Sequence, residues 1–277
     1  MTVRSRLETL ARLGFAARGL VYLLIGYAAF RASRGAGDTE GSREAIQGLG
    51  GSTAGPVLLA LVALGLLGYG VWRIVNAAMG EGDDEGGRTG PFVRVGHALS
   101  GAAHLLLAFT AARLLFASGG GGAGEDQQAR GAAATAMELP FGETLVVLVG
   151  VGLAAAGVSQ LVEAVRARFM RHVGATGPAR DAVEWIGRAG YLARGLVFAF
   201  AGYLLIGAGL ESDPSGASGL GGVLQRVQSL PSGRLILLLI SIGLVMFGVF
   251  SFVLARYRRV TMPDPNRVVG TGSRRRR

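Results

Sequence analysis

Residues 11–26 read ARLGFAARGLVYLLIG, and residues 187–202 read GRAGYLARGLVFAFAG. Both stretches follow one pattern, Arg-x-Gly-aromatic-x-x-Arg-Gly-x-x-aromatic, which begins at Arg12 in the first and at Arg188 in the second. A third stretch, beginning at Arg94, keeps the pattern in part. It retains Gly96 and Gly101 and carries His97, Ser100 and His104 at the other positions. Self-similarity at three places indicates a repeat architecture.

A second pattern follows each of these stretches and marks a second apolar segment. It reads Gly-Leu-x-x-x-Gly-Val-x-x-x-Val-x-Ala and supplies glycines at matched positions. These glycines are Gly65, Gly70, Gly152, Gly157, Gly243 and Gly248. Matched glycines let helix backbones approach closely, which is how helices associate where lipid removes the hydrophobic drive. We therefore expect them to lie at contacts between helices.

The apolar residues predict helices that span a membrane. Of the 277 residues, 50% are hydrophobic and 17% are charged, whereas about a quarter are charged in an ordinary soluble domain. The apolar residues gather into blocks, each about as long as the roughly 20 residues that a helix needs to cross a bilayer. These blocks cover residues 13–30, 56–75, 95–116, 144–165, 191–210 and 235–254. They lack the alternation of a barrel strand, so they are predicted to be helices.

The predicted fold is an all-α membrane protein with six transmembrane helices, arranged as three tandem two-helix repeats around a pseudo-threefold axis. A single transmembrane domain is expected over residues 1–259, with repeat units at about 9–80, 92–172 and 185–259. Residues 260–277 are expected to form a disordered, basic cytoplasmic tail.

Short helices are expected in the long outer connections. Apolar residues at helical spacing around 223–230 predict an amphipathic helix that lies on the outer membrane surface. Weaker patterns near 44–49 and 132–139 suggest equivalent pieces.

The charged residues predict the orientation of the chain. All 28 basic residues are arginine, and the net charge is +10. Of these arginines, 21 fall in one alternating set of termini and connections, and 7 fall in the other set. This positive-inside bias predicts a multi-pass protein of the cytoplasmic membrane with both termini in the cytoplasm. The expected partners are the lipid bilayer with its anionic headgroups and an unidentified membrane protein, but no nucleic acid.

The residue inventory excludes several kinds of chemistry. Cysteine and lysine are both absent, which excludes disulfides, thiolate metal sites, phosphate-binding lysines and Schiff bases. No metalloprotease or serine-hydrolase motif is present. The sequence therefore predicts no catalytic residue, no metal and no cofactor.

Two sets of arginines are candidate polar sites. Arg12, Arg94 and Arg188 occupy the same repeat position, and they could ring a vestibule that attracts anions or, as we favour, extend to lipid headgroups. Arg18 and Arg194 lie six residues further along, about 9 Å deeper. They are expected to pair with Glu163, with Asn76 or with freed carbonyls, as a polar clamp rather than a transport site.

The remaining candidates belong to the second repeat. His97 and His104 share one helix face, but a separation of about 10 Å along the axis is too large for ordinary shared metal ligation. We expect them to pack as aromatic side chains do, with one hydrogen bond. Glu163 is a carboxylate inside an apolar block, a functional candidate by default. We expect it to form a local ion pair with Arg166 or Arg168.

The stretches at residues 11–26 and 187–202 resemble the uncharacterised membrane family catalogued as domain of unknown function 1206. Members of that family carry a two-helix module three times. The resemblance covers about residues 9–259, and the second copy departs from the pattern at His97, Ser100 and His104. It implies a fold and a membrane location, and it implies no activity.

The sequence favours a non-enzymatic structural or interaction component embedded in the membrane. The alternative is a transporter or channel for small molecules or ions along the pseudo-threefold axis. A membrane enzyme is the third choice, because the chain has few nucleophiles and metal ligands.

Overall fold

The computed structural model of the chain describes residues 3–36, 39–41, 44–47, 55–79, 90–116, 124–174 and 178–257. Within these ranges the chain is helical and contains no β-strand. The long helices are α1 (Val3–Ser33), α3 (Gly55–Met79), α4 (Pro91–Phe116), α6 (Gly142–Arg166), α7 (Pro178–Leu210) and α9 (Gly233–Tyr257). The shorter elements are α5 (Glu125–Met137), α8 (Leu220–Gln228) and the 3₁₀ turns η1 (Arg168–His172) and η2 (Pro214–Gly216). The predicted tail at residues 260–277 lies outside the described residues.

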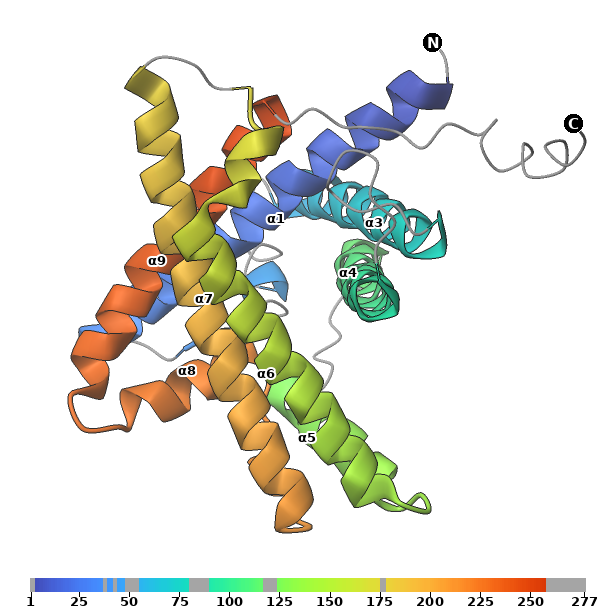
Figure 1. Cartoon of the computed structure of the whole chain (residues 1–277), viewed down its shortest axis with the longest axis vertical. Helices are drawn as coiled ribbons and strands as arrows, with labels where there is room; N and C mark the ends of the chain where they lie inside the picture. The colour runs from blue at the N-terminus through green and yellow to red at the C-terminus, as the bar shows by residue number, and fades with distance from the viewer. Residues whose placement is uncertain are drawn as a thin grey trace, which may run out of the picture.

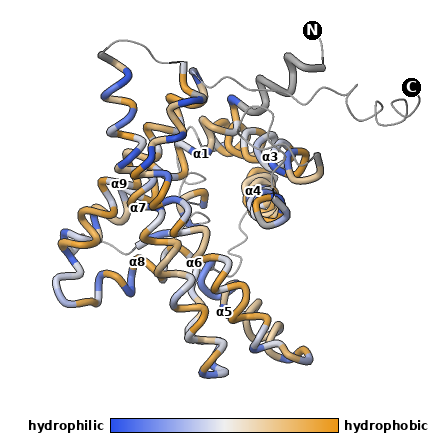
Figure 2. The backbone as a smooth tube through the Cα atoms, viewed as in Figure 1, coloured by the Kyte–Doolittle hydropathy of each residue, from blue (hydrophilic) through white to orange (hydrophobic). Residues whose placement is uncertain are grey.

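Each long helix contains a span that is long and apolar enough to cross a membrane. Hydrophobic residues run along these helices, whereas the beginning of α7 is hydrophilic (Figure 2). Many apolar side chains on the helix surfaces are exposed, and on α4 these include Val95, Leu99, Leu106 and Phe109, each more than half exposed. Such a surface is exceptional in water and ordinary in lipid. The prediction of an all-α membrane protein with six such helices is confirmed.

The long helices are arranged as three closely packed pairs, α1 with α9, α3 with α4, and α6 with α7. In each pair, the second helix of one repeat packs against the first helix of another. The helices α1 and α3 also contact each other, as do α7 and α9, so the three pairs are joined (Figure 1). The pairs run in different directions, because α4 is seen nearly end-on where α6 and α7 cross the view (Figure 1).

Glycines at matched positions allow each pair to pack closely. A methyl carbon added to Gly19 would lie 2.9 Å from the backbone oxygen of Gly248, and the reverse distance is also 2.9 Å. The other two pairs repeat this relationship through Gly70 with Gly101 and through Gly157 with Gly195. Three interfaces therefore use the same repeat positions, as expected for helices that associate through small residues. The pseudo-threefold axis itself remains a prediction.

The second repeat differs from its sisters inside the repeat. In the first repeat Gly65 packs against Ala17, and in the third Gly243 packs against Ala193. A methyl carbon on the equivalent Gly152 would meet nothing within 4 Å. The residue that corresponds to Ala17 and Ala193 is Leu99, which is 66% exposed. The residue at this position is thus larger in the second repeat, and α4 and α6 are not among the helix pairs with substantial contact in the described structure.

The core is built mainly from α1, α3 and α9. Its aliphatic part includes Ile25, Val62 and Leu244, all 0–1% exposed. An aromatic part surrounds Phe15 and Phe250, and η1 contributes to it through Phe169. The interior that joins α1, α3 and α9 is thus filled by large side chains.

The short helices fold against the bundle and against one another. The predicted amphipathic helix is confirmed as α8, and its apolar residues Val223 and Leu224 are buried in the protein core at 0–1% exposure. Its position on the outer membrane surface stays a prediction. The second piece is α5, which begins earlier than predicted. Residues 44–47 are helical, and the rest of the 44–49 pattern lies outside the described residues.

Carboxylates hold these three outer segments together. The Glu44 carboxylate accepts a hydrogen bond from the backbone N–H of Glu125 at 2.8 Å, and the Glu125 carboxylate accepts one from the N–H of Leu220 at 3.2 Å. Asp126 accepts another from Gly222. The N–H groups in the first turns of α5 and α8 have no partner within their own helix, and these carboxylates accept hydrogen bonds from them.

Candidate functional site: an arginine and aromatic cluster inside the bundle

The first arginine of each repeat binds the end of a neighbouring helix. Arg94 on α4 donates to the carbonyl oxygens of Ala77 and Ala78 at 2.7 and 2.8 Å, at the end of α3. Arg12 on α1 donates to the carbonyl oxygen of Arg256 near the end of α9. Both arginines therefore cap a helix C-terminus, where carbonyls lack partners and the helix dipole favours a cation.

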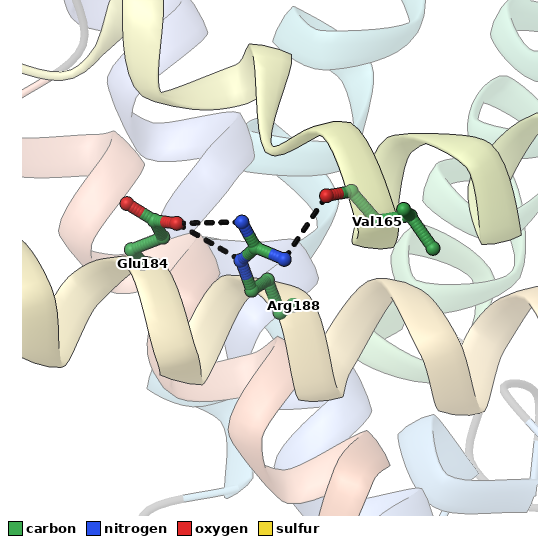
Figure 3. Close-up of polar contacts among 3 residues, drawn as sticks. All are labelled: Val165, Glu184 and Arg188. Atoms are coloured by element: carbon green, nitrogen blue, oxygen red, sulfur yellow. Dashed lines mark hydrogen bonds and ion pairs between the residues drawn. The ribbon is translucent and has the colours of Figure 1, made fainter.

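Arg188 follows the same rule in the third repeat. It donates to the carbonyl oxygen of Val165, the next-to-last residue of α6, at 3.0 Å, and it is paired with Glu184 one turn earlier on α7 (Figure 3). Neither the vestibule nor the headgroup interpretation of these three arginines anticipated this capping role.

Arg18 lies inside the bundle, with only 6% of its surface exposed. Its Nη1 donates to the hydroxyl of Tyr69 at 2.9 Å, and its Nε donates to the hydroxyl of Ser251 at 3.3 Å. The guanidinium carbon also lies 5.0–5.1 Å from the ring centres of Phe15, Tyr69 and Phe247. Cations at this distance from a ring face are attracted by its quadrupole.

Arg194 occupies the equivalent position in the third repeat and has a different environment. Its guanidinium carbon lies 4.7 Å from the centre of the Phe198 ring, 5.0 Å from Phe247 and 5.6 Å from Tyr22. Its Nε is buried and has no hydrogen-bond partner. Its contacts within the described structure are therefore made to ring faces. A desolvated N–H group without an acceptor is costly, which makes Arg194 the most unusual polar residue of the bundle.

Phe247 connects the two arginines, because both guanidinium carbons lie 5.0 Å from its ring centre. A third arginine, Arg73, donates its Nε to the Tyr69 hydroxyl at 3.1 Å. Among the described residues, no carboxylate contacts Arg18 or Arg194. The predicted pairing of these arginines with Glu163 or Asn76 is therefore wrong. Hydroxyl groups and aromatic rings stabilise the positive charge instead.

Glu163 and Asn76 lie elsewhere. The Glu163 carboxylate accepts a hydrogen bond from the backbone N–H of Phe169 and so caps η1. The predicted ion pair of Glu163 with Arg166 or Arg168 is not formed among the described residues. Asn76 is buried on α3, 6% exposed. Neither residue belongs to the cluster of Arg18 and Arg194.

His104 of the second repeat packs as an aromatic residue does. The His104 ring centre lies 4.6 Å from that of Tyr69, and its Nδ1 lies 2.7 Å from the carbonyl oxygen of Ser100, which can only accept a hydrogen bond. His97 is also buried, 9% exposed. Packing with one hydrogen bond agrees with the expectation for His104. In the described ranges, no group of three or more histidine and carboxylate residues could hold a metal ion.

Sequence reasoning did not identify Tyr69, Phe247 and Ser251 as part of this site. Tyr69 and Phe247 both lie four residues after the first glycine of the second repeat pattern. The equivalent residue of the second repeat is Ala156, so an aromatic residue at this position is not shared by all three repeats. The cluster is thus a feature of the first and third repeats, and the second contributes His104 to its edge.

Comparison with known proteins places the chain among relatives. The profile of the family described as Domain of Unknown Function (DUF1206) matches residues 13–80, 95–167 and 189–258. These three segments confirm the three-repeat prediction. The chain is also 31% identical over 258 residues to the "Uncharacterized protein YxxB" of Bacillus subtilis (strain 168), with 92% of each chain covered. No solved structure matches the chain.

Proposed function

The chain belongs to the DUF1206 family, and from this membership and the geometry of its helices we propose that it is a non-enzymatic membrane component that binds a transmembrane helix of another protein. The observation that carries this proposal is the unfilled interface of the second repeat. In the first and third repeats, another helix of the chain packs against the glycine at this position. In the second repeat, a methyl carbon placed on Gly152 would meet nothing of the described chain within 4 Å.

The two helices of the second repeat are also the least covered. Within the apolar spans of α4 and α6, 22% and 17% of the residues are buried, compared with 56% in α1. The two helices are not among the pairs with substantial contact in the described structure. Gly96 and Gly152 both face open space, and small residues of this kind allow close approach of a second helix in lipid.

The transporter alternative receives less support from the interior. The positions where α1, α3 and α9 meet are filled by Phe15, Tyr69 and Phe250, each 0–1% exposed. Conduction needs a path lined by polar groups or water, whereas here aromatic rings occupy the space beside Arg18.

A cysteine scan tests the binding surface, because the chain contains no cysteine of its own. Gly152→Cys carries a thiol-reactive photo-cross-linker to the open face, and Gly207→Cys carries it to α7, where a methyl carbon would also meet nothing within 4 Å. We expect the Gly152 position alone to cross-link, in native membranes, to one discrete membrane protein. Cross-links to lipid alone, or equal products from both positions, contradict the proposal. Cross-links to a second copy would identify self-association instead.

The orientation is part of the proposal. The arginine bias supports a location in the cytoplasmic membrane with both termini in the cytoplasm. A membrane-impermeant thiol reagent applied to intact cells should label Arg34→Cys, in the connection after α1, and should spare Arg171→Cys in η1. The reverse labelling would contradict this orientation.

A further inference from the structure

A basic pocket lies where the end of α6, the turn η1 and the beginning of α7 meet. Its volume is about 520 Å³, within the range of small-molecule sites in proteins. The charged residues that line it are Arg166, Arg168, Arg171, Arg180, Arg188 and Glu184. Five arginines and one carboxylate leave the pocket strongly positive.

The one carboxylate of the lining is already engaged. Glu184 binds Arg188, whose remaining nitrogen donates to Val165 (Figure 3). The other four arginines make no hydrogen bond or ion pair with any residue that the structure describes. The pocket therefore offers several unused guanidinium groups, each with donors in a planar fork that matches phosphate oxygens.

The wall formed by η1 is held in place by buried contacts. Ala167 ends α6 in a left-handed conformation, with a φ of 47°, and turns the chain back. Phe169 then stacks on Tyr191, with ring centres 5.1 Å apart, and Met170 is 5% exposed. Because these neighbours are fixed in the core, Arg168 and Arg171 are directed to the pocket.

The pocket also lies at the boundary of the apolar region. The apolar span of α6 ends at Arg166, and the apolar block within α7 begins at residue 191, so the pocket residues of α7 precede that block. Trp185 on α7 is 72% exposed, and Tyr257, whose carbonyl oxygen accepts a hydrogen bond from the N–H of Gly174, is 50% exposed. Such residues are enriched at the interface between lipid and water. A ligand in this pocket would be at the depth of phospholipid headgroups.

We propose that this pocket binds a phosphate group, carried either by an anionic phospholipid or by a soluble phosphate compound. The excess of guanidinium groups selects a ligand with negative charge, and the forked donors favour phosphate oxygens. Basic pockets between transmembrane helices hold lipid phosphates in this way. The proposal is independent of the helix-binding function, because the pocket lies at the end of α6 and the beginning of α7 and its lining does not include Gly152.

The test uses the purified full chain in neutral detergent. The double variant Arg171→Gln with Arg180→Gln removes two charges from the pocket, and neither arginine makes a hydrogen bond or ion pair in the described structure, so the fold should be unchanged. The matched control, Arg31→Gln with Arg34→Gln, removes two exposed charges at the far end of α1. Both variants should elute as monodisperse as the unmodified chain.

One arm adds phosphatidylglycerol or phosphatidylcholine and measures the lipid retained by native mass spectrometry. The other arm titrates inorganic phosphate and pyrophosphate and follows the midpoint temperature of unfolding. We expect the pocket variant to bind roughly tenfold more weakly, or worse, because it loses two arginines that each contribute about as much as one contact with a headgroup. The control should bind as the unmodified chain does.

The arm that responds identifies the source of the phosphate. Selective retention of phosphatidylglycerol that the pocket variant loses assigns a lipid ligand. Saturable stabilisation by phosphate or pyrophosphate that the same variant loses assigns a soluble one. The proposal is overturned if the pocket variant and the control behave alike in both arms.

Discussion

Gly70 on α3 and Gly101 on α4 face each other so closely that a methyl carbon on either would lie 3.0 Å from the backbone oxygen of the other. Equivalent glycines meet between α6 and α7 and between α9 and α1. The closest helix pairs are therefore formed between repeats, whereas the contact within a repeat is made by α1 with α3 and by α7 with α9 but not by α4 with α6. We therefore expect some glycines of the repeat to tolerate substitution and others not.

The first prediction compares two glycines five residues apart on α6. Gly157→Leu should misassemble or lose about 1–3 kcal/mol of stability or more, because a methyl carbon there would lie 2.5 Å from the backbone nitrogen of Ala199. Gly152→Leu should be tolerated, since its surroundings are open. Size-exclusion elution and the midpoint of unfolding in detergent measure both. Equal damage from the two substitutions would contradict the packing described here.

The second prediction concerns the hydroxyl that two arginines share. Tyr69→Phe keeps the ring but removes the oxygen that accepts from Arg18 and Arg73. Hydrogen bonds to charged groups are worth about 1.5–3 kcal/mol, so we expect a loss of stability of that order. Tyr203→Phe, on the exposed face of α7, is the control and should have no measurable effect on denaturant unfolding.

The third prediction concerns the unusual arginine of the third repeat. Arg194→Met should leave the free energy of unfolding unchanged or raise it by roughly 1–2 kcal/mol, because an apolar side chain removes the cost of burying an Nε without an acceptor. A clear decrease would show that contact with the Phe198 and Phe247 rings outweighs that cost. The unfolding curves of the variant and the unmodified chain decide between these results.

The fourth prediction concerns the helix caps. Arg94→Met removes two hydrogen bonds to carbonyls in the last turn of α3. It should lower the free energy of unfolding by about 1 kcal/mol, less than a buried charged hydrogen bond contributes, because Arg94 is exposed to solvent. Arg130→Met removes an exposed arginine of α5 that has no such role. If both variants unfold at the same midpoint, the capping role is wrong.

The fifth prediction concerns pH and the turn after α7. Hydrogen bonds from the Ser215 hydroxyl and backbone N–H lower the pKa of Asp213 below its usual 3.8. Because the pKa of this carboxyl is lower in the folded state, its ionised form stabilises the fold at pH values above its usual pKa. That contribution to stability is lost as the pH falls through the folded-state pKa. Ser215→Ala should raise the pKa of Asp213 toward 3.8, as followed by NMR titration of that carboxyl. An unchanged titration would remove the hydroxyl as a cause.

The sequence predicted the helices well because lipid imposes length and apolarity on every span. It also identified Gly70 and Gly157 as packing positions, but periodicity describes one face of a helix and does not name the helix that covers it. The partners Gly101 and Gly195 therefore came only from the structure. The same limit affected Arg94, whose carbonyl acceptors belong to a different repeat.

The arginine cluster was predicted only in part. Arg18 and Arg194 stood out because charge inside an apolar block is rare. The partners of these arginines were not predicted, because carboxylates are the usual partners of a buried cation, whereas Tyr69 and Phe247 offer a hydroxyl and ring faces. Leu99 in place of a repeat alanine was a visible signal of the open second repeat that the sequence reasoning passed over.

The packing of α9 against α1 also constrains how the molecule is made. Because α1 is synthesised before α9, Gly19 meets Gly248, and Arg18 finds the Ser251 hydroxyl, only once the later helix has been made. Until α9 is made, Arg18 lacks the acceptor that Ser251 supplies in the folded bundle. A nascent chain halted before residue 233 would lack α9, so α1 would have neither the helix that packs against Gly19 nor the Ser251 acceptor of Arg18.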